Sequence, residues 1–468
     1  MDDTPEARSA PCAVRLLALR PGRPSRVPFE AGFRAAFKRF ALDRNSHSGA
    51  CVIVVENLPV PFDRRVWQEA KALRDAGYRV CVICPLNQDY RKEYEEIDGI
   101  EIHRHPLPVE ARGKLAFLAE YSFALFHEFR LLLRIYRAKG VSVIQACNPP
   151  DLIFLAALPF RLLGVRFIFD QHDLCPELFV AKFGRKGVFY WLLRGAEWLT
   201  YKSADFVITA NDTFREIALE RGAKAPEKVS AVYSIPDRKN IYRTQPEPGV
   251  AGGRKFVLGY LGIIGDQDGL DYLVRAVAHL IRELDFSDFQ ALVVGDGPAL
   301  GSARALAEEL GVADHVTFTG FLSGERLMRH LSAFDIGIIP DPVNETNDKM
   351  SMNKVFEYCA LGIPTVAFPL TETRRLLGDA GVYAPTPDAK GLARACLELM
   401  KDDALRRSKS ETAKKLSDTA FKWEREEKKY LAAYAQVLGR GANEGADGQI
   451  RPSDRATETG VEGPEPPR

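Results

Sequence analysis

Short apolar runs alternate with amphipathic stretches from about residue 50 onward. The runs predicted as strands are Cys51–Val55, Arg79–Cys84, Val141–Gln145, Val165–Asp170, Phe206–Thr209 and Val229–Val232. Helical spacing of apolar residues predicts helices over Phe62–Ala76, which Gly77 ends, and over Leu152–Leu163. Strands separated by helices form parallel βαβ units, so the first half of the chain predicts a doubly wound parallel sheet.

The same alternation restarts after a stretch rich in Pro and Gly, Gln245–Arg254, which reads as a linker. The second set of predicted strands is Phe256–Tyr260, Ala291–Val294, Val316–Phe318, Ile336–Pro340, Thr365–Phe368 and Val382–Tyr383. A helix is predicted over Leu270–Leu284. The sequence therefore predicts two α/β domains of similar size, each with a Rossmann-like doubly wound parallel sheet.

These patterns divide the chain into five parts. Residues 1–48 mix Pro, Ala and Arg without periodicity and lack the apolar core of a signal peptide, so we expect a disordered extension. The N-terminal domain spans 49–245 and the C-terminal domain 246–418. A closing helix follows over Thr419–Leu438, and residues 439–468, rich in Gly, Glu and Pro, read as a disordered tail.

Composition narrows the class of protein. The 468 residues carry a formal net charge of +1, so no overall field attracts nucleic acid. Eight scattered cysteines, of which Cys81 and Cys84 form the only close pair, indicate buried thiols in a reducing cytoplasm. No apolar run is long enough to cross a membrane. The stretches Phe117–Tyr136 and Phe189–Tyr201 are either packed within the domain or in peripheral contact with the inner face of the membrane.

The segment Ser351–Tyr358 holds the most informative pair of charged residues. Its apolar positions repeat at helical spacing, with Ser351 as a candidate N-cap and with Lys354 and Glu357 together on the opposite face. A lysine in a first helical turn opposes the helix dipole unless an anion binds there. The pattern is therefore either a diphosphate site with Glu357 on the ribose, or an exposed Lys–Glu pair.

Further candidate residues lie where ligands bind in α/β sheets, beyond the carboxyl ends of the strands. His172 follows a strand and can donate to a phosphate or sugar oxygen, with Asp173 orienting it; the alternative is a solvated turn. Gly262 and Gly265 lie between a strand and a helix, where backbone can approach a phosphate or simply form a tight turn.

Two other groups are weaker candidates. Asp266-Gln267-Asp268 has the form of a metal-binding pair, but a solvated turn is the preferred interpretation, so no metal is expected. Arg64 and Arg65, after the first strand, can meet a phosphorylated acceptor or can simply be solvated in the first turn of a helix.

Taken together, the motifs resemble those of glycosyltransferases with the GT-B fold, in the large retaining family 4, and in particular those that build bacterial exopolysaccharide or lipopolysaccharide. The resemblance covers roughly residues 50–438. It is carried by Phe62-Asp63-Arg64-Arg65-Val66-Trp67, Asn148-Pro149-Pro150-Asp151, Asp170-Gln171-His172-Asp173-Leu174-Cys175-Pro176-Glu177, Gly259-Tyr260-Leu261-Gly262, Gln267-Asp268-Gly269, Gly295-Asp296-Gly297-Pro298 and Asn353-Lys354-x-x-Glu357-Tyr358.

The resemblance implies two domains facing across a cleft and assigns roles to several residues. It places Glu357 on the donor ribose and His172 on the donor sugar and phosphate. It places Gly262 and Gly265 beneath the phosphates, and it gives the diphosphate to Lys354 and to the helix N-terminus near Asn353. Such enzymes need no metal or other cofactor.

Two departures from the family pattern bear on phosphate binding. Lys349 stands eight positions before Glu357, where the family has the first glutamate of E-x7-E, and Asp268 stands where a phosphate-binding lysine is usual.

The expected reaction moves a sugar from a UDP- or GDP-sugar to a hydroxyl of a saccharide or lipid-linked saccharide with retention of configuration. A UDP-N-acetylglucosamine 2-epimerase and a non-catalytic nucleotide-sugar-binding subunit remain as alternatives.

Overall fold

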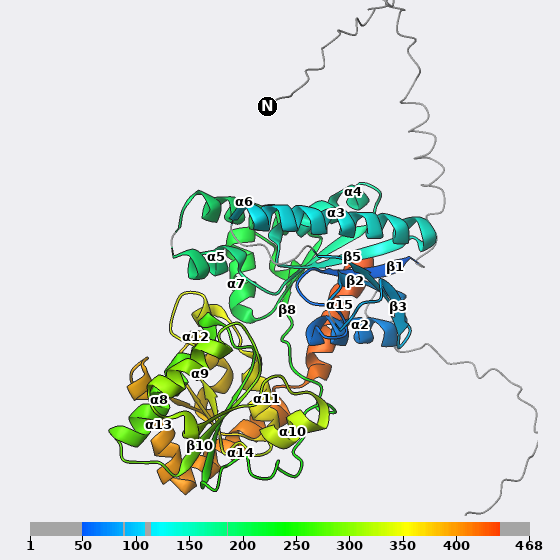
Figure 1. Ribbon diagram of the computed structural model, residues 1–468. Coiled ribbons are helices and arrows are strands. Elements are labelled where there is room, and N and C mark those ends of the chain that lie inside the picture. The colour runs from blue at the N-terminus through cyan, green and yellow to red at the C-terminus, as the bar shows by residue number, and fades with distance from the viewer. Residues whose placement is uncertain (1–48, 88, 108–113, 185, 440–468) are drawn as a thin grey trace, which may run out of the picture. The chain divides into compact units, whose positions relative to one another are not determined.

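The computed structural model describes residues 49–439 except 88, 108–113 and 185, and describes no side chain for residues 114–121 and 182. The predictions for residues 1–48 and for the tail beyond Gly439 lie outside the described residues. Figure 1 shows two α/β domains along the described chain, with the closing helix lying against the first of them.

The N-terminal domain is built on an eight-stranded sheet in the order β3-β4-β2-β1-β5-β6-β7-β8. The strands are β1 (Ala50–Val55), β2 (Val80–Pro85), β3 (Tyr94–Ile97), β4 (Ile100–His105), β5 (Val141–Cys147), β6 (Arg166–Gln171), β7 (Phe206–Thr209) and β8 (Val229–Ala231). All neighbours are parallel except β3 and β4. The order reverses between β1 and β5, and ligands bind at such a point.

Helices cover both faces of this sheet, as the near-continuous apolar strands require. They are α2 (Arg64–Asp75), α3 (Lys114–Lys139), α4 (Phe154–Arg161), α5 (Cys175–Phe183), α6 (Val188–Ser203) and α7 (Asp212–Gly222). One buried apolar cluster joins the sheet to α3 and α4, and another joins it to α2 and α15 (Trp423–Leu438) (Figure 1).

The C-terminal domain has a six-stranded, fully parallel sheet in the order β11-β10-β9-β12-β13-β14. Its strands are β9 (Phe256–Leu261), β10 (Phe289–Val294), β11 (Val316–Phe318), β12 (Ile336–Ile339), β13 (Thr365–Ala367) and β14 (Gly381–Tyr383). Its helices are α8 (Leu270–Arg282), α9 (Leu300–Glu309), α10 (Gly324–Leu331), α11 (Asn353–Leu361), α12 (Thr371–Leu377), α13 (Ala389–Lys401) and α14 (Asp403–Thr419). This is the Rossmann strand order, so the predicted fold class is confirmed.

Some elements differ from the prediction. The hairpin of β3 and β4 was not predicted, although Asp98 and Gly99 at its turn both adopt positive φ, the backbone that an Asp-Gly hairpin turn uses. The closing helix begins at Trp423, because α14 runs to Thr419 and the chain breaks its helical path between them. All seven cysteines within the described ranges are buried, as expected.

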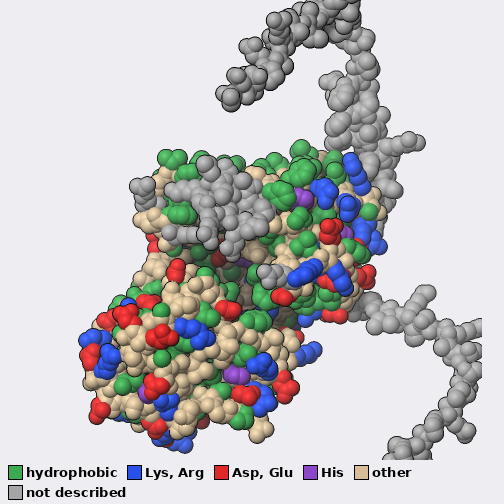
Figure 2. Space-filling model, viewed as in Figure 1, with side chains coloured by type: hydrophobic (Ala, Val, Ile, Leu, Met, Phe, Trp, Pro, Cys, Tyr) green, Lys and Arg blue, Asp and Glu red, His purple; other side chains and the backbone are tan. Residues whose placement is uncertain are grey.

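Large apolar side chains are exposed on α4 and α6. The most exposed are Leu162 at 77%, Val188 at 75%, Trp191 at 68% and Leu192 at 62%. Others on α3, α4 and α6 include Phe123, Phe126, Leu155, Leu158, Leu163, Phe189, Trp198 and Leu199. Figure 2 shows hydrophobic side chains gathered along the edge of the N-terminal domain where these helices lie, and we call this set the apolar face. Among the described residues, no helix combines the length and hydrophobicity that a membrane span needs.

Glu128 of α3 is fully buried, and neither of its oxygens has a hydrogen-bond partner among the described residues. Burial raises the pKa of Glu128 to about 8. Because the pKa of Glu128 is higher in the folded state than in the unfolded chain, protonation of this carboxyl stabilises the fold. That contribution is complete below the unfolded-state pKa of 4.5, and it is lost as the pH rises toward 8. We therefore expect Glu128→Gln to melt progressively higher than the unmodified protein between pH 5 and pH 8.5, by several degrees.

Thermal melts at both pH values test this expectation. The exposed Glu216→Gln is the matched control, because its side chain is 59% exposed and its substitution should shift both melts alike. A Glu128→Gln difference that does not change with pH would contradict the prediction.

Candidate active site

His172 lies just beyond the carboxyl end of β6, and its ring is held from behind. Its Nε2 atom lies 2.9 Å from Asp170 Oδ2 and 3.1 Å from Arg65 Nε. Arginine can only donate, so the Nδ1–H tautomer accepts from Arg65, whereas the Nε2–H form donates to Asp170. Because both contacts use Nε2, Nδ1 is the ring nitrogen left for a substrate in either form.

The side chain of Arg65 is only 9% exposed and makes most of its contacts within the N-terminal domain. Its guanidinium donates to Asp170 Oδ1 at 2.8 Å, to the Val232 carbonyl at 2.7 Å and to Ser234 Oγ at 3.1 Å. It also lies 3.1 Å from Glu69 Oε1, one helical turn along α2. These contacts of Arg65 are all to residues of its own domain, so the structure gives it a role in holding Asp170, which corrects its assignment to a phosphorylated acceptor.

The pKa values of the two buried carboxyl groups behind His172 are shifted in opposite directions. Burial alone would raise the pKa of Asp170, but Arg65 and His172 outweigh it and hold that pKa well below its usual range. Burial, followed by the neighbouring Asp170 charge, raises the pKa of Glu69 well above its usual range. Asp170 is therefore the carboxylate that Arg65 holds as an anion, and the pKa of Glu69 is shifted in the opposite direction.

Gln145 joins these carboxylates to the closing helix. Its Nε2 atom donates to Glu69 Oε2 at 2.7 Å and to Asp170 Oδ2 at 2.8 Å. Its Oε1 atom accepts from Tyr430 and Tyr434 of α15, each at 2.6 Å. Neither Gln145 nor Glu69 was predicted; the signal for Gln145 is a lone amide inside the otherwise apolar strand Val141–Cys147.

Asp173 does not orient His172, which corrects the prediction. Asp170 and His172 are two positions apart along an extended chain and share one side, and the carboxylate that contacts the His172 ring is that of Asp170. The backbone of Asp173 is fixed by Asn148, whose amide donates to the Asp173 carbonyl at 2.8 Å. Burial raises the pKa of the Asp173 carboxyl, with His172 acting against it.

The helix α11 presents Glu357 to the N-terminal domain. Lys354 and Glu357 are both buried, so the interpretation as an exposed helical pair is wrong. Glu357 Oε1 accepts from Arg64 Nη1 at 2.8 Å, and the Arg64 side chain is 65% exposed whereas that of Glu357 is 4% exposed. Arg64, predicted on the acceptor side, thus meets the residue predicted to bind the ribose.

Two expectations about the start of α11 change. Ser351 is not the N-cap, which is Met352, because Ser351 Oγ donates instead to Glu372 at 3.3 Å. The helix therefore begins at Asn353, an exposed residue, with no side chain capping its first amides. Uncapped amides at a helix N-terminus are suited to an anion.

Lys354 is paired within the protein. Its Nζ donates to Asp341 Oδ2 at 2.7 Å and lies 4.9 Å from the centre of the Tyr260 ring. Burial works to lower the pKa of Lys354, but Asp341 more than offsets it, so the pKa is raised and the side chain stays charged. Because Asp341 already neutralises it, Lys354 supports the loop from beneath and is not the main charge on a diphosphate.

The glycine loops pack backbone against backbone. Gly295 adopts a φ of 146°, and a Cβ there would overlap the carbonyl oxygen of Gly262. The amide of Gly265, expected beneath the phosphates, donates to Asp268 Oδ2 at 2.8 Å. Asp268 therefore occupies the Gly265 amide, and the Gly262 amide donates to the Val294 carbonyl at 3.1 Å, so neither of these two amides is open to a phosphate in this structure.

Lys349, which stands in place of the first family glutamate, joins the two domains. Its Nζ lies 3.3 Å from Glu177 Oε1 of the N-terminal domain and 3.2 Å from Glu345 Oε1. Its carbonyl accepts from Asn211 Nδ2 at 2.9 Å. With Arg64 and Glu357, these contacts bring the carboxyl end of β6 and the start of α11 to the same interface.

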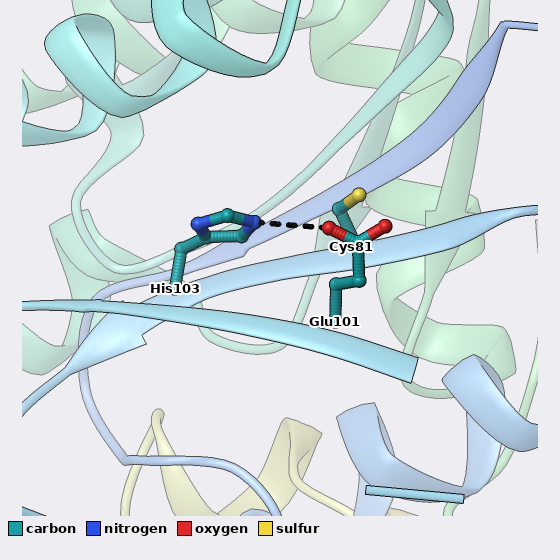
Figure 3. Close-up of side chains that lie close together, drawn as sticks. All are labelled: Cys81, Glu101 and His103. Carbon is teal, nitrogen blue, oxygen red and sulfur yellow. Dashed lines mark ion pairs between the residues drawn. The ribbon is translucent and has the colours of Figure 1, made fainter. Parts of the chain in front are cut away.

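Within the described part of the chain, two groups of side chains have donor atoms close enough to hold a metal: Cys81, Glu101 and His103, and Cys147, Asp170 and His172. In the first group, Glu101 Oε2 lies 3.6 Å from His103 Nε2 (Figure 3). Lys139 donates to both Glu101 oxygens. In the second, Arg65 bonds Asp170. A cation already compensates the carboxylate in each group, so we assign no metal to either.

Family models match both domains. The N-terminal domain matches the Glycosyl transferase 4-like domain over residues 63–233, and the C-terminal domain matches Glycosyl transferases group 1 over residues 255–402.

Relatives that match about three quarters of the chain are glycosyltransferases. The chain is 26% identical over 367 residues to alpha-D-kanosaminyltransferase of Streptomyces kanamyceticus, covering 75% of this chain and 92% of that protein. It is 29% identical over 157 residues to a GDP-mannose-dependent mannosyltransferase of Mycobacterium tuberculosis that acts on phosphatidylinositol monomannoside, covering 31% of this chain and 40% of that protein.

Solved structures share the fold. Sucrose-phosphate synthase from Thermosynechococcus elongatus superimposes with a TM-score of 0.68 at 18% identity, covering 84% of this chain and 100% of that one. HepE from Anabaena in complex with UDP-glucose superimposes with a TM-score of 0.62 at 17% identity, covering 83% and 99%.

Proposed function

The chain is a glycosyltransferase with the GT-B fold, and on that premise we propose that it moves a sugar from a UDP- or GDP-sugar to a hydroxyl of a lipid-linked saccharide. The observation that carries the donor half is the placement of Glu357. This buried carboxylate lies one turn into an uncapped helix and accepts from Arg64 of the domain that holds His172. Relatives that use GDP-mannose, and similar folds that bind UDP-glucose, support such a donor.

In this proposal the ribose hydroxyls donate to Glu357 and displace Arg64. The first amides of α11, from Asn353, receive the diphosphate. Arg64, released from Glu357 and mostly exposed, turns to the same diphosphate and supplies the charge that the buried Lys354 does not.

The bond between the anomeric carbon and the leaving phosphate oxygen breaks as negative charge collects on the diphosphate, which these groups stabilise. We propose retention by front-face attack, as the family resemblance implies. The acceptor oxygen bonds to the anomeric carbon, and its proton passes to a donor phosphate oxygen. His172 Nδ1 contacts the transferred sugar, held in place by Asp170 and Arg65.

We propose that the protein meets its lipid-linked acceptor at a membrane surface, and that the apolar face defined above is the part that contacts the membrane. All four acidic residues within residues 154–204 have little or no exposed side chain: Asp170, Glu177 and Glu197 are buried and Asp173 is half-buried. The exposed charges of the same stretch are basic and include Arg166, Lys186 and Lys202. Exposed Trp and Leu beside Lys and Arg fit the interface of an anionic phospholipid bilayer.

A screen of nucleotides by thermal shift tests the donor assignment. A bound donor raises the melting temperature by mass action, so UDP or GDP and the matching sugar nucleotide should stabilise the protein, and Glu357→Ala should remove that shift. A screen in which no nucleoside diphosphate changes the melt would overturn the proposal. Product analysis with the donor alone separates a transferase, which needs an acceptor, from an epimerase.

The membrane assignment predicts that the full chain sediments with vesicles containing phosphatidylglycerol, and less with phosphatidylcholine alone. The double variant Trp191→Glu, Leu192→Glu should stay in the supernatant, because charge on the exposed face opposes insertion. Tyr242→Glu is the matched control, an exposed aromatic outside the face. Equal sedimentation of both variants would contradict this role.

A further inference from the structure

The end of the folded chain contributes to the wall behind His172. Helix α15 packs against α2 and the N-terminal sheet, although it follows the whole C-terminal domain in sequence (Figure 1). Its Tyr430 and Tyr434 are completely buried. Both hydroxyls converge on one acceptor, Gln145 Oε1, which is 285 and 289 positions away in sequence.

This convergence fixes which way the Gln145 amide points. A side-chain amide can rotate by half a turn and exchange its oxygen and nitrogen. Two hydroxyl donors on one side hold the oxygen there, so both N–H bonds must face Glu69 and Asp170. In the reversed orientation the amide oxygen would face two carboxyl groups, and the tyrosine hydroxyls would face N–H groups.

Packing alone does not require this arrangement. Polar groups buried in full are costly, and an apolar set of similar volume would hold α15 against the sheet as well or better. What the hydrogen bonds do fix is the direction of the Gln145 amide. That direction makes Gln145 Nε2 a donor to Asp170 Oδ2, the same atom that contacts His172.

We propose that Gln145, Tyr430 and Tyr434 are positioning residues that hold Asp170, and through it the His172 ring, in the geometry used for sugar transfer. The inference rests on the proposed function for the role of His172. In this arrangement Asp170 Oδ2 is shared between Gln145 and His172, so the direction of the Gln145 amide sets the strength of the contact that holds the ring. The closing helix is then part of the active site without touching substrate.

The double variant Tyr430→Phe, Tyr434→Phe tests the proposal, because it keeps both rings and removes both donors. The readout is the ¹⁵N spectrum of the histidine rings in the full chain without ligand, with His172 identified by its loss in His172→Asn. Released from Gln145, Asp170 Oδ2 should accept more strongly from His172, and the Nε2 resonance should move toward the protonated form. An unchanged His172 resonance in the double variant would overturn the proposal.

Tyr201→Phe is the matched control. Tyr201 is also completely buried, and its hydroxyl donates to a different buried glutamine, Gln171 Oε1, at 2.9 Å. We expect Tyr201→Phe to lower the melting temperature without moving the His172 resonance. If Tyr201→Phe moves that resonance as far as the double variant does, Tyr430 and Tyr434 have only a structural role. If the double variant fails to fold, Tyr434→Phe alone gives the same comparison.

The same variants separate this inference from the donor assignment. Because Glu357 and α11 belong to the other domain, Tyr430→Phe, Tyr434→Phe should bind the nucleoside diphosphate with unchanged affinity by calorimetry. Absence of nucleotide binding in the unmodified protein would count against the proposed function, whereas the spectrum alone decides the positioning role.

Discussion

Replacing Arg65 with methionine should destabilise the protein by about 3–5 kcal/mol, the usual cost of removing one partner of a buried ion pair. Asp170 is ionised and completely buried, and Arg65 is the cation that bonds it, at 2.8 Å. Methionine fills a similar volume but leaves that charge uncompensated, and it also leaves the Val232 carbonyl without its donor. A lower melting temperature and an earlier urea midpoint would both report the loss.

The neighbouring arginine is the natural control. Arg64→Met removes a mostly exposed side chain whose ion pair is worth about 0–1 kcal/mol, so its melt should stay close to that of the unmodified protein. Adding Asp170→Asn to Arg65→Met should recover part of the stability, because the uncompensated charge is then gone. Equal melts for the two methionine variants would contradict the buried pair.

The contrast between Arg64 and Arg65 shows where sequence reasoning stops. Alternating apolar segments predicted both sheets, because strand and helix periodicity are local. The placement of candidates beyond strand ends also brought His172 and Glu357 into consideration. Which of two adjacent arginines is buried depends instead on β6 and β8, more than 100 positions away, and no local pattern contains that information.

Contacts between residues far apart in sequence also explain why the role of Lys354 in α11 was not predicted. The conflict between Lys354 and the helix dipole was visible in the sequence, and an anion was the expected solution. The structure solves it with Asp341, which follows a different strand and approaches only when the sheet forms. A polar residue beyond β12 was detectable by the rule that identified His172, but its pairing with Lys354 was not.

Removing the Arg64 side chain should have opposite effects on a nucleoside and on its diphosphate, if Arg64 first occupies Glu357 and then the phosphates. Uridine or guanosine, whichever base the thermal screen selects, competes with Arg64 for Glu357, so Arg64→Ala should tighten its binding up to about fivefold. The diphosphate loses a charged donor worth about 1.5–3 kcal/mol and should bind ten- to about a hundredfold more weakly.

Calorimetry with both ligands measures the two effects in one variant, and Glu357→Ala separates them. Without its carboxylate the ribose loses its acceptor, so nucleoside and diphosphate should both weaken, by roughly tenfold or more. Arg64→Ala added to Glu357→Ala should then affect only the diphosphate, because the competition at Glu357 no longer exists. If Arg64→Ala weakens both ligands equally, Arg64 does not exchange between the carboxylate and the phosphates. If it changes neither, the diphosphate is held by the α11 amides without it.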